Sequence, residues 1–445
     1  MNNIGCFPVY IINLSERVDR LAHSQWQFKA RTEFSPVFFN ACKDKVGAVG
    51  LWMSVCNIIK EVYSDESDFV IICEDDHEFT VHYSYEVLNK CINEGRQVGA
   101  DVLIGGASAV SSLFKVSDRL VWLDGFTGTQ FIIVYKSFYT TLLNADFHKI
   151  DSLDYKLTEL SDRILMIYPF ISIQKDFGYS DVTVLNNSLR RVDGLFRDAS
   201  DTTRYLLDNQ KYYSNCPALV LKGDIENISV PVYILNISKN DRHCDHISRQ
   251  FFGKSEFEVR YLNNGKYDSD NASVLESFRN IFQNGLTDGD DVIVVGRSDL
   301  QFTDSYSRDM LFCHIMEAHT QGCDILFGGV SGGFDYALPV SDIRFWINDY
   351  RSSSFVVFFR KCFQRILDRD CSWEQSMERF ISELSANKMV AFPFLCTQHD
   401  FGLCIDEQDQ NIYAGLLNSM YLDSHNRLQK IKKAYDKYAL MHYAI

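Results

Sequence analysis

The residues with the clearest chemical potential are three consecutive carboxylates, Glu74, Asp75 and Asp76, which directly follow the apolar run 69–73. Adjacent carboxylates at the end of a buried strand repel one another unless a cation or hydrogen-bond donors offset their charge. Mg²⁺ or Mn²⁺ fits such a place, because one or two carboxylates bind it together with substrate phosphates. A cation held there could neutralise a departing diphosphate in glycosyl or phosphoryl transfer. A solvated acidic turn is the alternative interpretation, since isolated acidic triplets are common.

Other charged side chains are candidates for the same site. Arg17 and Arg20 follow the first apolar run and could contact phosphates or a base as fixed cations, although arginines on a solvated helix face would look the same. Glycosyl transfer with inversion at the sugar carbon also needs a base, such as a carboxylate, that takes the proton of the acceptor hydroxyl. Asp154, Asp176 and Asp181 are the candidates for that base, and Asp154 and Asp181 are favoured because Asp176 recurs as Asp400 in the second half of the chain, which indicates a structural role. His77, next to the triplet, is expected on the surface.

Alternating elements must position these residues. Short runs rich in Val, Ile, Phe and Tyr predict buried strands at 9–13, 69–73, 102–104 and 131–135. Apolar residues at helical spacing between them, as in 51–62, predict covering helices. This alternation predicts an α/β fold with a mostly parallel, Rossmann-like sheet and a site at the carboxyl ends of its strands.

The chain also contains a long internal repeat. Segments 8–15 and 101–106 recur 223 residues later at 231–238 and 324–329, and segment 168–178 recurs 224 residues later at 392–402. Three matches in the same order indicate a duplicated domain, because the unit is far too long for a solenoid repeat. We therefore expect domains at 1–190 and 228–406, a helical linker at 191–227 and a helical basic tail at 407–445.

The second copy lacks most of the acidic triplet. Arg297, Ser298 and Asp299 stand where the first copy has its three carboxylates. Two negative charges are lost and a cation is gained, although the preceding strand is retained. If the first copy binds a metal ion, the second copy is not expected to bind one in the same way.

Several short motifs follow one another in the first copy. They are a strand followed by Asn13, Leu14, Arg17 and Arg20, then Gly50-x-x-x-Ser54, the acidic triplet, Gly128-Thr129, Asp154, and Pro169 with Gln174, Ser180 and Asp181. In this order they resemble family 25 glycosyltransferases, the group that contains bacterial lipooligosaccharide galactosyltransferases. One position departs from that family, which has His after the Ser of the second motif where this chain has Val55.

The resemblance implies two tandem GT-A-like domains, a nucleotide sugar donor that is typically UDP-linked, and Mn²⁺ or Mg²⁺ at the acidic triplet. It implies metal ligation by Asp76 and Glu74. It also implies nucleotide contacts from Asn13, Arg17, Arg20, Ser54, Glu74 and Asp75. Because Asn13 and Ser54 have counterparts in the second copy, a role of these two residues in the fold is equally consistent with the sequence.

Composition narrows the class of protein. With 46% hydrophobic and 23% charged residues, the chain is not expected to be mainly disordered. A net charge of −15 disfavours nucleic acid as a partner, since an acidic surface repels phosphates. The 13 cysteines are spread singly and the N-terminus shows no signal peptide, so we expect reduced thiols and a cytoplasmic protein. No run of about 18 apolar residues predicts a membrane span.

The segment 424–445 combines five Lys and Arg residues with one carboxylate and has apolar residues at helical spacing. Such a basic amphipathic helix is typical of peripheral contact with an anionic membrane, where lipid-linked acceptors are found. Packing of the same apolar residues against the second domain is the alternative.

These inferences combine into one hypothesis and two alternatives. We expect a metal-dependent hexosyltransferase that uses a nucleotide sugar and a surface glycan or lipid-linked acceptor, with an inactive or accessory second domain. The first alternative is a bifunctional enzyme with two active domains. The second is a non-catalytic glycan-binding or scaffold protein.

Overall fold

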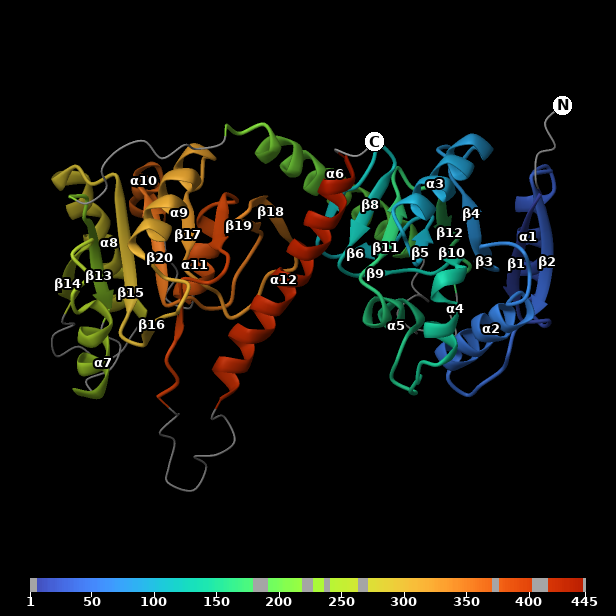
Figure 1. The fold of residues 1–445 in the computed structure, drawn as a ribbon, viewed down its shortest axis with the longest axis horizontal. Coiled ribbons are helices and arrows are strands. Elements are labelled where there is room, and N and C mark those ends of the chain that lie inside the picture. Colours follow the sequence, from blue (N-terminus) through green and yellow to red (C-terminus); the bar gives the residue numbers. More distant parts are fainter. Residues whose placement is uncertain are drawn as a thin grey trace, which may run out of the picture. The chain divides into compact units, whose positions relative to one another are not determined.

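The computed structural model describes residues 6–178, 191–217, 227–235, 241–262, 271–369, 376–401 and 415–442. The chain forms two compact units. Unit 1 comprises Met1–Gln210 with Lys433–Ile445, and unit 2 comprises Lys211–Lys432. Helices flank a large sheet in each unit (Figure 1).

Unit 1 is built on an eight-stranded sheet in the order β2-β1-β3-β10-β5-β11-β8-β7. Six strands run in one direction, and β10 and β8 run in the other. In the order of the sheet, the strands are β2 (Phe34–Asn40), β1 (Phe7–Asn13), β3 (Phe69–Glu74), β10 (Phe131–Tyr135), β5 (Val102–Ile104), β11 (Ile164–Ile167), β8 (Leu120–Leu123) and β7 (Leu113–Lys115).

The remaining elements of unit 1 connect and cover this sheet. Two small sheets pair β4 (His77–Phe79) with β12 (Ser172–Gln174) and β6 (Ala109–Val110) with β9 (Phe126–Thr127). The helices are α1 (Val18–Phe28), α2 (Gly47–Glu61), α3 (Tyr85–Gln97), α4 (Lys136–Leu143), α5 (Leu153–Leu160) and α6 (Arg191–Ser214), of which α6 continues past Gln210 into unit 2.

The central strands carry the core of unit 1. Val9, Ile11, Ile71, Leu103 and Ile133 are completely buried. Neighbouring residues of a strand point to opposite faces of the sheet, so a strand buried on both faces must be apolar throughout. The continuous apolar runs of β1, β3 and β10 therefore follow from their central places in a sheet that is covered on both sides.

Unit 2 repeats this architecture with the strand order β14-β13-β15-β20-β17-β21-β19-β18. Its strands are β14 (Phe257–Leu262), β13 (Val230–Leu235), β15 (Val292–Arg297), β20 (Phe355–Phe359), β17 (Ile325–Phe327), β21 (Lys388–Ala391), β19 (Arg344–Ile347) and β18 (Ala337–Ser341), with β16 (Leu300–Phe302) and β22 (Cys396–Gln398) as a small separate pair. Its helices are α7 (Asp241–Phe251), α8 (Asn271–Asp288), α9 (Arg308–Thr320), α10 (Phe363–Asp368) and α11 (Met377–Leu384), with a short 3₁₀ turn at Arg360–Cys362. The predicted fold class, two tandem α/β domains with mostly parallel sheets and a C-terminal helix, is confirmed.

The C-terminal helix is α12 (Leu416–His442), whose residues up to Lys432 belong to unit 2 and whose later residues belong to unit 1. Its apolar residues Leu428, Ile431 and Tyr438 are buried. These residues are therefore covered by protein, but packing against the second domain alone does not describe the helix, because Tyr435 and Tyr438 contact Phe114 of unit 1. No helix in the described segments is long and apolar enough to cross a membrane.

The helix that follows each sheet is part of the repeat. The buried positions of α6 recur 225 residues later in α12, which pairs Phe196, Ala199, Thr203, Leu206 and Tyr213 with Tyr421, Ser424, Leu428, Ile431 and Tyr438. Phe196 and Tyr421 are therefore equivalent positions.

Candidate functional site

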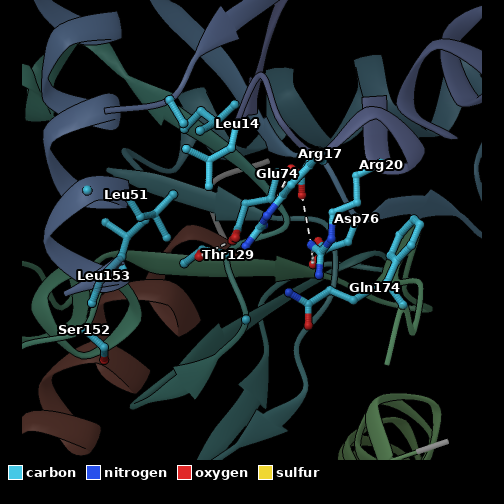
Figure 2. Close-up of a pocket in the computed structure, with 18 of the residues that line it drawn as sticks. Leu14, Arg17, Arg20, Leu51, Glu74, Asp76, Thr129, Ser152, Leu153 and Gln174 are labelled. Atoms are coloured by element: carbon cyan, nitrogen blue, oxygen red, sulfur yellow. Dashed lines mark hydrogen bonds and ion pairs between the residues drawn. The ribbon is translucent and has the colours of Figure 1, made fainter. Parts of the chain in front are cut away.

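Unit 1 contains a cavity of about 690 Å³. Six residues predicted for the site line it, namely Arg17, Arg20, Glu74, Asp75, Asp76 and Asp154 (Figure 2). Strand pairing explains why the first five meet. β1 and β3 are parallel neighbours with Ile12 opposite Glu74, so the residues after both strands lie at the same edge of the sheet.

Helix α1 packs a polar face against residues 74–76, which we call the acidic turn. The buried polar side chains of this helix are Arg20, His23, Ser24 and Gln27. The hydroxyl of Ser24 donates to the carbonyl oxygen of Asp75 at 2.9 Å, and the side-chain oxygen of Gln27 accepts from the backbone N–H of Phe79 at 3.2 Å. These bonds replace the apolar contacts of an ordinary buried helix face, and they fix the acidic turn relative to the two arginines.

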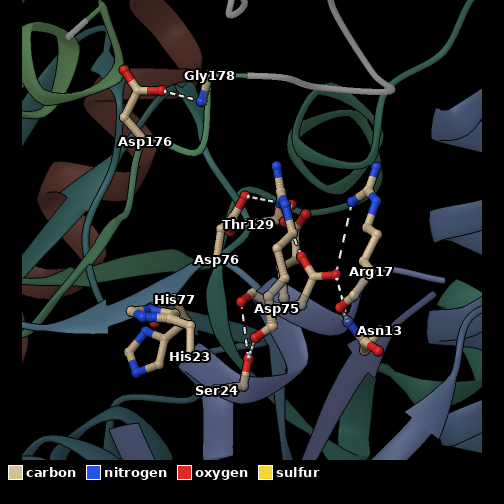
Figure 3. A network of polar contacts seen from close by, with 12 residues as sticks. Asn13, Arg17, His23, Ser24, Asp75, Asp76, His77, Thr129, Asp176 and Gly178 are labelled. Atoms are coloured by element: carbon tan, nitrogen blue, oxygen red, sulfur yellow. Dashed lines mark hydrogen bonds and ion pairs between the residues drawn. The ribbon is translucent and has the colours of Figure 1, made fainter. Parts of the chain in front are cut away.

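Asp75 is the carboxylate of the turn with the most partners. It accepts a hydrogen bond from Asn13 Nδ2 at 3.0 Å and one from Arg20 Nη1 at 2.9 Å (Figure 3). Arg17 Nη1 lies 3.7 Å from its second oxygen. Asn13 itself is buried and does not line the cavity. The structure therefore places Asn13 behind Asp75, where it holds the carboxylate toward the arginines.

Glu74 and Asp76 are less well compensated. Glu74 accepts one hydrogen bond from the hydroxyl of Thr129 at 2.7 Å, and burial together with the charge of Asp76 raises the pKa of Glu74 to about 8. One oxygen of Asp76 accepts from Arg20 Nη1 at 2.8 Å. The other, Oδ1, is buried without a hydrogen-bond partner among the residues that the structure describes. Burial raises the pKa of Asp76 to about 6, although Arg20 partly opposes this effect.

This donor set fits a divalent cation that takes further ligands from a substrate. Asp76, which has one unpaired oxygen, and Glu74 line the same cavity, and carboxylates are hard oxygen ligands of the kind that Mg²⁺ and Mn²⁺ prefer. Across the described ranges, no group of three or more His, Cys, Asp and Glu residues is arranged to hold a metal ion. A cation at this place would therefore need phosphate oxygens or water to complete its shell.

Asp154 lies at the first turn of α5, where it organises the opposite wall. Its carboxylate accepts hydrogen bonds from the backbone N–H groups of Gly128 at 3.2 Å and Tyr155 at 2.9 Å, and from the hydroxyl of Ser152 at 2.5 Å. Gly128 has a φ of +104°, which a residue with a side chain rarely adopts. Asp154 thus anchors the segment that presents Thr129 to Glu74, in addition to facing the cavity.

The Gly50-x-x-x-Ser54 motif holds the loop 41–46, which follows β2. Ser54 is fully buried and does not line the cavity. Its hydroxyl accepts from the backbone N–H of Cys42 and donates to the carbonyl of Gly50, both at 2.8 Å. A Cβ on Gly50 would lie 2.5 Å from the carbonyl oxygen of Cys42. Both motif residues therefore serve the close approach of this loop to α2, and Gly50 lines the cavity whereas Ser54 does not.

The loop and the start of α2 bring two lysines and a helix N-terminus to the cavity, beside the carboxylates of Glu16 and Asp44. Lys43 and Lys45 line the cavity, and Lys43 pairs with Glu16 at 2.8 Å. Helix α2 begins at Gly47. The residue at its N-cap position, Val46, makes no side-chain capping hydrogen bond to the described residues. The N-terminus of a helix carries partial positive charge and unbonded N–H groups, which favours anions. The lining of the cavity thus includes both the acidic turn and anion-attracting groups.

Aromatic and cationic side chains cover the Arg20 end of the cavity. Phe177, which lines it, lies 4.8 Å from the guanidinium of Arg20 and 5.1 Å from the ammonium of Lys175. Asp176 also lines the cavity and accepts from the backbone N–H of Gly178 at 2.8 Å (Figure 3). Asp181, the other predicted base, lies outside the described residues.

The expectation that His77 lies on the surface is wrong. Its side chain is 1% exposed, and its Nδ1 lies 2.7 Å from the hydroxyl of Ser172. The ring packs edge-on against Phe79 at 4.2 Å. Burial holds the pKa of His77 well below its usual range. The charged neighbours of His77 in the sequence suggest exposure, whereas the partner of its Nδ1 lies 95 residues away.

Unit 2 has a different charge pattern at the equivalent turn. Arg297, at the position of Glu74, pairs with Asp299, at the position of Asp76, at 3.0 Å. The same guanidinium lies 3.8 Å from Glu378, the counterpart of Asp154. A cation of the turn itself, Arg297, thus stands where unit 1 has the carboxylate of Glu74.

Sequence reasoning missed several residues of the cavity. Thr129 and Gln174 were recognised as parts of motifs but not as lining residues, and Lys43 and Lys45 were not recognised at all. The loop of the two lysines has no periodicity that would place it. A helix whose inward positions are polar, as in α1, is the one sequence signal that could have indicated a polar site beneath it.

Comparisons with known proteins assign no family. A scan against protein-family models finds no match, and a search of curated proteins finds none either. Among solved structures, UDP-glucose pyrophosphorylase in complex with UDP-glucose is similar over 45% of this chain and 82% of its own, with 12% identity and a TM-score of 0.26.

Two further solved structures are similar to parts of the chain. HddC from Yersinia pseudotuberculosis aligns with 45% of this chain and 80% of its own, with 12% identity and a TM-score of 0.26. The glycosyltransferase GlyE of Streptococcus pneumoniae TIGR4 aligns with 57% and 74%, with 8% identity and a TM-score of 0.21. Likenesses at this level assign neither a family nor an activity.

Proposed function

We propose that unit 1 is a metal-dependent glycosyltransferase of the family 25 type, which transfers a hexose from a UDP-linked sugar to a surface glycan or a lipid-linked acceptor. The observation that carries this proposal is the pair of poorly compensated carboxylates, Glu74 and Asp76, in a cavity that two lysines and the N-terminus of α2 also line. A nucleoside diphosphate bound with a divalent cation would satisfy both sets of groups.

Each group of cavity residues in unit 1 would have a distinct role in this reaction. Glu74 and Asp76 would hold Mn²⁺ or Mg²⁺, which supplies Lewis-acid stabilisation of a leaving diphosphate when bound. Lys43, Lys45 and the N-terminus of α2 would attract the phosphates. Arg17 and Arg20 keep Asp75 in place, and Arg20 also holds one oxygen of Asp76.

A base must also take the proton of the acceptor hydroxyl if transfer proceeds with inversion. Asp154 lines the cavity, but its three hydrogen-bond donors favour a positioning role. Asp181 remains the other candidate. In unit 2, the Arg297–Asp299 pair supports an inactive or accessory role, because the carboxylate that would bind a cation is already neutralised.

The test uses Asp76→Asn, with Asp299→Asn in unit 2 as the matched control. Mn²⁺ and UDP binding are measured by calorimetry, and hydrolysis of UDP-hexoses is measured by release of UDP. We expect Asp76→Asn to lose metal-dependent binding and to lower turnover by on the order of 100-fold or more, while Asp299→Asn preserves both.

Other outcomes would favour the alternatives. Full activity of Asp76→Asn would contradict the proposal. Two separable products, one lost in each variant, would favour a bifunctional enzyme. Absence of UDP and Mn²⁺ binding by the unmodified chain would favour a scaffold or glycan-binding protein.

A further inference from the structure

Gln174 and Gln398 occupy equivalent positions in the two units. Each is the last residue of the short strand that pairs antiparallel with the strand after the turn, β12 with β4 in unit 1 and β22 with β16 in unit 2. In the pairing register, Gln174 lies opposite His77 and Gln398 lies opposite Leu300, and these partners are themselves equivalent. The two glutamines therefore allow a direct comparison of one side chain in two surroundings.

In unit 2, the amide of Gln398 is fully used within the protein. Its Nε2 donates to Asp299 Oδ2 at 3.2 Å. Because a carboxylate only accepts, the far end of the amide must be the oxygen. That oxygen accepts from the hydroxyl of Ser352 at 3.0 Å and from the hydroxyl of Tyr421 at 3.2 Å.

Unit 1 lacks both of these hydroxyl donors. The position of Ser352, three residues before β20, is Gly128, three residues before β10. The position of Tyr421 in the helix that follows the sheet is Phe196. The side-chain oxygen of Gln174 has therefore lost both donors that its counterpart uses.

Gln174 also lacks a replacement partner. Its side chain makes no hydrogen bond to the described part of unit 1, and it lines the cavity together with Asp76 and Thr129 (Figure 2). In unit 1, Arg20 donates to Asp76, the counterpart of Asp299, at 2.8 Å, and among the described residues no hydrogen bond joins Gln174 to Asp76. Both ends of this amide are thus available to a molecule in the cavity.

We infer that Gln174 recognises the transferred sugar by accepting a hydrogen bond from one of its hydroxyl groups. The groups removed from its oxygen are hydrogen-bond donors, so the ligand group that replaces them must donate as well. A diphosphate has only acceptor oxygens near neutral pH, so the donor must be a hydroxyl of the hexose or a donor group of the nucleoside, and the comparison of UDP with UDP-hexoses below separates these two sources. This role rests on the proposed function, and it makes Gln174 a determinant of sugar specificity rather than of nucleotide binding.

The test compares UDP with a panel of UDP-hexoses in the presence of Mn²⁺, by calorimetry on the full chain. Gln174→Met keeps the length of the side chain and removes the amide, and Gln174→Asn shortens the amide as a second variant. Both should weaken binding of the preferred UDP-hexose by about 3- to 10-fold and change UDP binding by less than about 1.5-fold. Gln398→Met is the matched control, which should change neither affinity but lower the melting temperature.

A deoxygenated donor identifies the hydroxyl. Gln174→Met should bind the matching deoxy-hexose as well as the unmodified chain does, because the contact is already absent. Equal loss of UDP and UDP-hexose binding in the Gln174 variants, or no loss of either, would overturn the inference while leaving the proposed function intact. Failure of the unmodified chain to bind UDP or any UDP-hexose would refute the proposed function and the role of Gln174 with it.

Discussion

Glu74→Gln tests whether the buried charge of the acidic turn lowers the free energy of unfolding. In the metal-free chain, burial and the neighbouring charge of Asp76 raise the pKa of Glu74 from 4.5 to about 8. The hydroxyl of Thr129 donates to Glu74, and the side-chain oxygen of glutamine can accept the same hydrogen bond. The substitution therefore removes a titrating group and little else, so its effect on stability isolates the cost of that group.

The sign and size follow from linkage. Because the folded pKa is raised, the unfolded state loses its proton first, and the stability of the unmodified chain falls as the pH rises from 4.5 to about 8. Each unit of pH in this interval corresponds to about 1.4 kcal/mol, which gives an upper limit of roughly 3.4 kcal/mol at pH 7. Glu74 keeps part of its surface toward the cavity, where water screens it, so we expect about 1.5–2 kcal/mol.

Differential scanning calorimetry in the presence of a chelator measures this effect. Glu74→Gln should melt about 3–8 °C higher than the unmodified chain at pH 7 and at the same temperature near pH 4.5. Asp75→Asn is the contrasting control, which should melt lower at pH 7 because Asn13 and Arg20 lose a charged acceptor. A lower melting temperature for Glu74→Gln at pH 7, or a gain that is equal at both pH values, would refute the reasoning.

Three further outcomes are expected. Gly50→Ala should lower the free energy of unfolding by about 1–3 kcal/mol and weaken UDP binding, because its Cβ would meet the carbonyl of Cys42 at 2.5 Å; urea unfolding and calorimetry measure the two effects. The depressed pKa of His77 should make stability fall as the pH drops below 6.5, where only the unfolded state gains the proton, and His77→Gln should flatten this slope in urea unfolding between pH 5 and 7. Mn²⁺ affinity should rise between pH 6 and 8, since a cation requires Glu74 and Asp76 without protons, and a pH-independent affinity in calorimetry would contradict this assignment.

The sequence predicts those site residues whose positions follow from the order of the strands in the sheet. The apolar runs predict β1 and β3, and a parallel α/β sheet brings the residues that follow neighbouring strands to one edge. This reasoning places Arg17, Arg20 and the acidic turn together, and the structure brings them to one cavity. It needs no knowledge of side-chain packing, which is why it succeeds from sequence alone.

The parts that could not be predicted depend on contacts between distant segments. Ser54 was a candidate for nucleotide binding, yet its hydroxyl is used by the backbone of Cys42 and Gly50 behind the cavity wall. The buried His77 depends on Ser172, and the orientation of Thr129 depends on Asp154 through the intervening glycine. Each of these contacts joins elements whose separation in space is not encoded in local periodicity.

A comparison of the two units distinguishes the contacts that both folds share from the charges that only the acidic turn of unit 1 has. The side-chain oxygens of Gln27 and Gln250 accept from the backbone of equivalent residues, and Tyr83 and Tyr306 both donate to an equivalent glutamate. These shared hydrogen bonds are therefore compatible with the charge pattern of either turn. In unit 2, the turn is neutralised internally by Arg297, which shows that the architecture does not need three carboxylates there.

The fold does not require the three carboxylates of unit 1, and their mutual repulsion lowers its stability. Glu74 and Asp76 repel each other, and one oxygen of Asp76 has no partner in the described chain, whereas Arg297 and Asp299 satisfy each other. A sequence that specifies one structure normally avoids such conflicts except where a ligand resolves them. The contrast between the two copies therefore supports the proposal that a cation binds at the acidic turn of unit 1, whereas the turn of unit 2 contains a cation of the protein, Arg297.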